Sequence, residues 1–154
     1  MTQNRTAPTV ALACDHAGFP LKAAVEALLA AAGCTIHDHG TDGLARVDYP
    51  DFAHAACRDV ATAGADVAVL ICGSGVGMSI AANRHPEIRC VLAHDATTAR
   101  LGRAHNDANA LALGARITGE EVVADIVHAF LATQFEGGRH VGRIAKLAPQ
   151  ETAA

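Results

Sequence analysis

Short apolar runs alternate with stretches of helical periodicity along the chain. Continuous apolar runs of this length predict buried strands, and the expected strands are 9–14, 34–38, 66–71, 89–93 and 108–113. Between them, apolar residues recur every three or four positions, which predicts helices over 20–32, 51–63, 78–84, 96–104 and 120–133. Pro20 suits the first turn of its helix, Gly33 the end of the same helix, and Asp51 the cap of the next.

This alternation indicates a parallel sheet, because no hairpin dipeptide joins two apolar runs and each crossover carries a helix. The run DVAVLI (66–71) lacks a polar face, as expected for a central strand covered on both sides. We predict a single-domain, Rossmann-like three-layer α/β/α fold with a five-stranded parallel sheet. Ligands of such sheets bind at the carboxyl ends of the strands.

Length and composition narrow the class of protein. The 154 residues favour one domain, predicted over 9–148, with flexible termini at 1–8 and 149–154. No apolar run approaches the roughly 20 residues of a membrane span, and MTQNRTAPTV lacks the apolar centre of a secretory signal. We expect a cytoplasmic protein. The net charge of −4 argues against general attraction to nucleic acid or anionic membranes.

The five cysteines predict free thiols rather than a disulfide framework. Their number is odd, their spacing is wide and no CxxC pair occurs, so a structural zinc site is not expected either. Three of them, Cys14, Cys34 and Cys90, fall in or beside predicted strands, as buried structural cysteines do.

The stretch VLICGSGVGMSIAAN (69–83) leads from a strand through three glycines into a helix. Glycines at 73, 75 and 77 permit positive φ and close approach of a ligand, and the helix start offers N–H groups to a phosphate or an oxyanion. The alternative is a tight turn with no ligand. Nucleotide binding is disfavoured, because no Gly-Lys-Ser/Thr follows and Met78 replaces the last glycine of a dinucleotide fingerprint, although Asp95 lies at the distance of a ribose-binding acid.

Cys72 directly precedes this turn. A helix N-terminus lowers the pKa of a thiol, so a thiolate at this position could act as nucleophile or base; a buried structural cysteine is the alternative. His105 has two interpretations as well: a helix C-cap, or an acid/base imidazole at a strand end.

Two further groups of side chains stand out. Arg139 and Arg143 are four residues apart and, together with His140, could clamp a phosphate dianion or form a solvated face. His37 and His39 lie on one side of a strand and could bind a metal ion. With no third ligand nearby in the sequence, we predict no metal site there.

Five motifs, in this order, resemble the ribose-5-phosphate isomerase B / LacA–LacB sugar-phosphate isomerase family over residues 10–147. The motifs are CDHAGFPLK (14–22), DYP (48–50), ICGSGVGMSIAANR (71–84), HNDAN (105–109) and EGGRHVGR (136–143). The resemblance implies aldose–ketose isomerisation through a cis-enediolate, without cofactor or metal, in a cysteine-type member. It also implies a homodimer or dimer of dimers whose active site lies at the dimer interface and receives part of the tail from the partner.

The resemblance also assigns roles by position. Cys72 matches the base, Ser74 the hydroxyl that helps to shuttle protons, and His105 the group that opens the sugar ring. The N–H groups of residues 73–77 match the anion hole. The remaining matches are Asp15 and Asn106 with sugar hydroxyls, His16, Arg116, Arg139 and Arg143 with the phosphate, and Arg46 and Tyr49 with the loop bordering the pocket. The residues of the anion hole are Gly73, Ser74, Gly75, Val76 and Gly77.

The resemblance leaves the substrate open. Ribose 5-phosphate, interconverted with ribulose 5-phosphate in the pentose phosphate pathway, is the default. Allose 6-phosphate, galactose 6-phosphate and a tetrulose 4-phosphate are alternatives, and the loop 40–49, especially 44–47, is expected to set sugar length. A non-catalytic phospho-ligand binding subunit is a further alternative, against which Cys72 and His105 argue.

Overall fold

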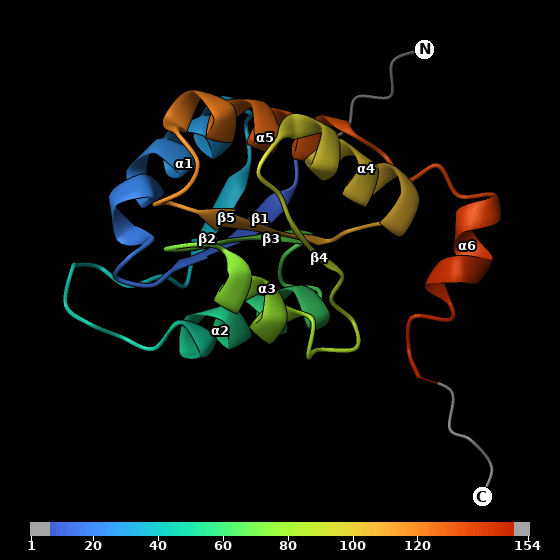
Figure 1. Ribbon diagram of the computed structural model, residues 1–154, viewed down its shortest axis with the longest axis horizontal. Coiled ribbons are helices and arrows are strands. Elements are labelled where there is room, and N and C mark those ends of the chain that lie inside the picture. The colour runs from blue at the N-terminus through green and yellow to red at the C-terminus, as the bar shows by residue number, and fades with distance from the viewer. Residues whose placement is uncertain (1–6, 150–154) are drawn as a thin grey trace, which may run out of the picture.

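A five-stranded parallel sheet separates two layers of helices in the computed structural model, which describes residues 7–149 (Figure 1). The strand order is β2-β1-β3-β5-β4, with every pair parallel. The strands are β1 (Thr9–Cys14), β2 (Thr35–Asp38), β3 (Val67–Cys72), β4 (Cys90–Leu92) and β5 (Ala110–Gly114). The predicted fold class is confirmed.

The helices α1, α4 and α5 cover one face of the sheet, and α2 and α3 cover the other (Figure 1). The short helix α6 lies to one side of the sandwich, beyond α4 (Figure 1). Their bounds are α1 (Phe19–Ala31), α2 (Tyr49–Ala61), α3 (Val76–Ala82), α4 (Ala96–Asn106), α5 (Glu120–Ala132) and α6 (Arg139–Ile144). None of the helices in the described range has the length and apolar character needed to cross a bilayer.

The central strand β3 shows why its sequence has no polar face. Its six residues are all buried. Val69 and Ile71 pack with α1 and α5, whereas Leu70 and Cys72 pack with α2 and α3. Successive side chains of a strand point to opposite faces, so a strand covered on both sides must be apolar throughout. The hydrophobic core between the sheet and the helices α2 and α3 is rich in alanine, which lets these helices approach the sheet closely.

Some predicted boundaries differ from the observed ones. Helix α2 begins at Tyr49, and its N-cap is Asp48 rather than Asp51. Pro50 fits the first turn because it needs no N–H partner there, and Asp51 lies in the same turn, where the helix dipole favours a carboxylate. Helix α3 likewise begins at Val76, two residues earlier than predicted. The predicted flexible termini, 1–8 and 149–154, fall mostly outside the described residues.

Candidate active site

A cavity of about 410 Å³ lies at the carboxyl ends of the central strands. Strand register brings the ends together, since Cys14 pairs with Ile71 and Cys72 pairs with Gly114. The residues lining the cavity are Asp15, His16, Ala17, Tyr49, Cys72, Gly73, Ser74, Gly77, Arg116 and Ile117. The cavity therefore lies at the edge of the sheet where the predicted topology places ligands.

The glycine turn between β3 and α3 has a conformation that only glycine adopts easily. Gly75 has φ of +77°, and a Cβ atom there would lie 2.6 Å from Leu92 Cδ1. The Gly75 N–H donates to Cys72 Sγ at 3.2 Å, and the Val76 N–H donates to Ser74 Oγ at 3.3 Å. The predicted row of free N–H groups is therefore partly occupied, and these two amides reach an oxyanion only if they give up their present partners.

Cys72 is the cysteine that lines this cavity. Burial raises the pKa of the Cys14 and Cys57 thiols to about 11 and raises that of Cys90 still further, so these thiols stay protonated. The hydrogen bond from the Gly75 N–H reaches the sulfur of Cys72 itself.

The turn after β1 holds two of the predicted substrate ligands. Asp15 is buried, and its Oδ1 accepts the Gly18 N–H at 2.8 Å. His16 Nδ1 accepts the Val47 N–H at 3.2 Å, which ties the turn to the loop before α2. A neutral imidazole that accepts at Nδ1 carries its proton on Nε2. His16 Nε2 is then a donor, as an anionic ligand requires.

Tyr49 and Arg116 reach the cavity from other elements. Tyr49 is the first residue of α2 and is 39% exposed. Arg116 follows β5 and lies over the glycine turn, since a Cβ atom at Gly73 would be 3.5 Å from its Cδ. Arg46 is exposed in the loop before α2.

His105 belongs to a second cluster, formed by α4 and the tail. Its ring stacks on that of His140, with centroids 4.4 Å apart and planes 12° from parallel. Both imidazoles face Glu136 Oε2, at 3.8 Å from His105 Nε2 and 3.6 Å from His140 Nε2. Burial lowers the pKa of His140, and the positive charges of His105, Arg139 and Arg143 act in the same direction. Arg139 and Arg143 lie on the short helix α6.

Within one chain, the cavity beside Cys72 and the cluster around His105 lie at opposite ends of the strands. Helix α4 returns from the carboxyl end of β4 to the start of β5, and His105 and Asn106 lie at its last turn. The four steps from Ala110 to Gly114 along β5 span about 13 Å at about 3.3 Å per residue. Within a single chain, His105 and the tail therefore do not reach Cys72.

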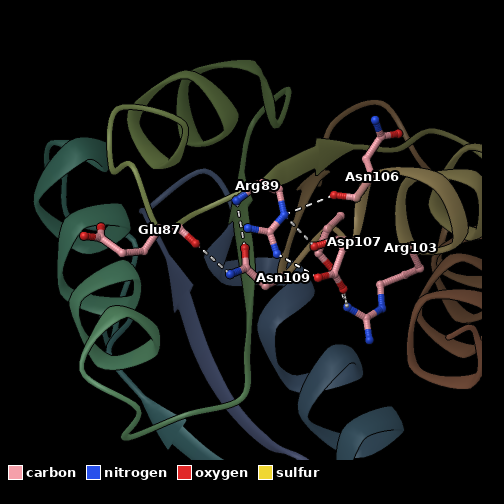
Figure 2. A network of polar contacts seen from close by, with 7 residues as sticks. Glu87, Arg89, Arg103, Asn106, Asp107 and Asn109 are labelled. Atoms are coloured by element: carbon pink, nitrogen blue, oxygen red, sulfur yellow. Dashed lines mark hydrogen bonds and ion pairs between the residues drawn. The ribbon is translucent and has the colours of Figure 1, made fainter. Parts of the chain in front are cut away.

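The HNDAN motif is held in place by Arg89, which sequence reasoning did not single out (Figure 2). Arg89 Nε donates to the carbonyl oxygen of Asn106 at 3.1 Å, and its Nη2 contacts Asp107 Oδ2 at 3.0 Å. Asp107 closes α4 in a left-handed conformation, with φ of 47°. Asn109 Oδ1 accepts the Arg89 N–H, and its Nδ2 donates to the carbonyl of Glu87 (Figure 2). The motif thus fixes the end of the helix that presents His105.

Asp95 was considered as a ribose-binding acid. Asp95 caps α4 and accepts the Thr98 N–H at 2.7 Å, so helix capping explains this residue without a bound ribose.

His37 and His39 have a third polar neighbour, which is Asp59 of α2. The distances to Asp59 Oδ2 are 2.7 Å from His37 Nδ1 and 2.9 Å from His39 Nε2. A third potential ligand therefore lies near the two histidines in space, although none lies near them in the sequence.

Comparison with known proteins shows the family of the chain and supports its fold. The Ribose/Galactose Isomerase family profile matches residues 10–147. The chain is 45% identical to ribose-5-phosphate isomerase B of Escherichia coli, covering 88% of this chain and 91% of that protein. It is 36% identical to the galactose-6-phosphate isomerase subunit LacB of Clostridium acetobutylicum, covering 89% and 79%. The structure of Trypanosoma brucei type B ribose 5-phosphate isomerase superimposes with a TM-score of 0.88, at 45% identity, covering 90% and 95%. The chain therefore belongs to the ribose/galactose isomerase family.

Proposed function

We propose that this protein interconverts an aldose phosphate and its ketose phosphate, with ribose 5-phosphate and ribulose 5-phosphate as the preferred pair. The observation that carries the proposal is the position of Cys72. Cys72 lines the strand-end cavity, its sulfur accepts the Gly75 N–H, and the residue borders a glycine turn suited to an enediolate. The cysteine removes the proton from one of the two reacting carbons and returns it to the other through a cis-enediolate.

The other residues of the cavity have roles that follow from their chemistry. Ser74 lies beside Cys72 and is placed to move protons between the sugar oxygens. Asp15 accepts hydrogen bonds from sugar hydroxyls, and Tyr49 closes one wall. The N–H groups of residues 73–77 stabilise the charge that develops on the enediolate oxygens, with Gly75 and Val76 doing so after releasing their present acceptors.

The phosphate is proposed to bind cationic and imidazole groups away from the reacting carbons. His16 and Arg116 are already at the cavity. Arg139 and Arg143 are exposed on α6 and can make paired hydrogen bonds to phosphate oxygens. Binding energy from this non-reacting end fixes the reacting carbons relative to Cys72.

A second copy of the chain is required to complete this site. His105, the proposed ring-opening acid/base, lies at the opposite end of the strands from Cys72, and so do Asn106 and the arginines of α6. In a two-fold dimer, the part of the partner that carries these residues can face the strand-end cavity, and each copy then completes the site of the other. Exposed apolar side chains on α3 and α6 favour such contact: Val76, Ile80 and Val141 are 44%, 52% and 55% exposed.

The edge beside β4 offers room for this association. A groove of about 750 Å³ runs there between the ends of α3 and α4 and the residues that follow α6. We propose that the protein acts as this homodimer, or as a dimer of dimers, in a reducing cytoplasm. The free state of all five cysteines supports that compartment.

An assay across a panel of aldose phosphates with four to six carbons, in the presence of EDTA, tests the proposed function. We expect the highest kcat/KM for ribose 5-phosphate, and no loss of turnover with EDTA. A preference for a six-carbon phosphate would reassign the substrate to the class of the galactose-6-phosphate isomerase relative. Binding of the phosphates without turnover of any of them would identify a non-catalytic binding subunit and overturn the proposal.

A further inference from the structure

We propose that His37, His39 and Asp59 form a binding site for a divalent transition-metal ion, with Zn²⁺ as the fitting ion, apart from the strand-end cavity. The three side chains offer two imidazole nitrogens and one carboxylate oxygen, all within 4.8 Å of one another. None of the three is among the residues that line the strand-end cavity. The site is independent of the proposed isomerase activity.

The backbone brings the two histidines to one face of an edge strand. His37 lies in β2, the outermost strand on its side of the sheet, and pairs with Ala11 of β1. The neighbouring Ile36 packs into the core shared with α1 and α5, so His37 points to the opposite face, where α2 lies. His39 continues the same alternation, and its N–H donates to the carbonyl of Leu12 at 2.8 Å.

Asp59 is held in position by the turn that ends α2. Its carbonyl oxygen accepts the N–H groups of Gly64 and Ala65 at 2.8 and 3.2 Å. A Cβ atom at Gly64 would lie 2.1 Å from Asp59 Oδ1, so a larger residue there would displace the carboxylate from its present position. The ligands therefore come from two elements whose relative position the fold already fixes, which reduces the ordering that metal binding requires.

The ligand atoms are near the spacing of a metal shell. With bonds of about 2.0–2.1 Å, ligands of tetrahedral zinc lie about 3.3 Å apart. The nitrogens now lie 2.7 and 2.9 Å from Asp59 Oδ2, as hydrogen-bonded atoms do, so a small outward rotation of each side chain admits the ion. Each neutral imidazole then moves its proton to the nitrogen that faces away from the carboxylate.

The chemistry of the donors selects the class of ion. Imidazole nitrogen suits Zn²⁺, Cu²⁺ and Ni²⁺, whereas Mg²⁺ and Ca²⁺ prefer shells made of oxygen. The side chains of His37, His39 and Asp59 are 42%, 29% and 17% exposed, so an ion can enter from solvent and water can complete its coordination. Two neutral imidazoles and one carboxylate leave a net charge of +1 on the occupied site, which solvent at this exposed edge readily accommodates.

The bound ion would join β2 directly to α2. The chain between these ligands includes the loop 39–48 and Tyr49, the residue with which α2 begins at the strand-end cavity. A link at the far end of α2 therefore holds that helix on the sheet. We expect the metal to stabilise the fold and to play no part in proton transfer.

The test compares the full-length, metal-stripped protein with three variants: the double variant His37→Asn/His39→Asn, the single variant Asp59→Asn, and the control His128→Asn, which changes an exposed histidine of α5. Calorimetric titration with ZnCl₂ should show a Zn²⁺ equivalent per chain that the first two variants lose and the control keeps. At a Zn²⁺ concentration about 100-fold above Kd, the Tm of the wild type should rise by about 5–10 °C.

Each variant is its own reference, because the readout is the change of Tm on adding metal rather than the Tm without it. If the double variant does not fold, Asp59→Asn and the wild type still decide the matter. An unchanged wild-type Tm with no Zn²⁺ uptake overturns the proposal. Equal uptake by the wild type and Asp59→Asn also overturns it, because the ion would then be bound by other histidines or thiols.

Discussion

The ring of Tyr49 lies against the backbone of Gly77, in the space that a side chain at position 77 would fill. A Cβ atom at Gly77 would be 2.7 Å from Tyr49 Cζ and 2.8 Å from Cε2. The last glycine of the turn therefore leaves space for the ring of the tyrosine that forms one wall of the cavity. The helix-forming cost of a glycine at this place is explained by that contact.

Gly77→Ala should displace Tyr49 and lower kcat/KM by about 10- to 100-fold, because a shift of about 1 Å in a positioning group has effects of this size. Stability should change little, since the tyrosine is exposed enough to move and alanine favours the helix. Steady-state kinetics and thermal unfolding check both expectations. Gly119→Ala is the matched control, because a Cβ atom there meets nothing within 4 Å. An unchanged kcat/KM in Gly77→Ala would show that this contact does not position Tyr49 for catalysis.

Arg143→Ala should raise KM for the sugar phosphate by about 10- to 100-fold and change kcat less, because a hydrogen bond to a charged group is worth about 1.5–3 kcal/mol. Steady-state kinetics measure both constants. Arg100→Ala is the control, since Arg100 is an exposed arginine of α4. An unchanged KM would take Arg143 out of the phosphate site.

Mixing two inactive variants tests whether the site is shared between copies. Cys72→Ala and His105→Asn should each be inactive as pure proteins. Mixed in equal amounts and allowed to exchange subunits, they should recover about a quarter of wild-type activity, because about half of the dimers are mixed and each mixed dimer contains one intact site of two. No recovery, with subunit exchange verified by mass spectrometry, would show that the site is not divided in this way.

Acid should destabilise the fold through His85. Burial lowers its pKa, and the neighbouring His54, 2.8 Å away between Nδ1 and Nε2, acts in the same direction. The folded chain then binds this proton less readily than the unfolded chain, so the unfolding free energy falls as the pH drops below the ordinary histidine pKa of about 6.5. His140 contributes with the same sign.

Urea unfolding of His85→Asn between about pH 7 and about pH 5 should show a shallower decline than the wild type. The lowered pKa values of Asp59 and Asp95 contribute only further towards acid, where unshifted carboxylates gain protons. A decline of equal slope in both proteins would show that His85 is not responsible.

Periodicity was sufficient to predict the sheet and its helices, because each element has one face or both faces buried. The apolar run ending at Ile71 predicted the central strand, and the turn that follows it predicted the cavity. Local boundaries were less accurate: Asp51 was expected to cap α2, but the helix begins earlier because Pro50 is acceptable in a first turn.

The distances between residues on different helices and strands could not be predicted from the sequence. The position of His105 depends on the direction of α4, which runs back to the end of the sheet where β5 begins. Asp59 became the third neighbour of His37 and His39 through the packing of α2 on the sheet, across a sequence separation of 20 residues or more. Arg89 gave no signal, because an arginine before a strand is common on a surface.

The turnover of ribose 5-phosphate by Cys72→Ala, compared with the wild type in the presence of EDTA, shows whether Cys72 is the base that moves the proton. The wild type should form ribulose 5-phosphate without added metal. The variant should still bind the substrate, measured by calorimetry, while kcat falls by at least about 100-fold, because the base that moves the proton is gone. A variant that turns over at a near-normal rate would contradict the account of Cys72 as the base.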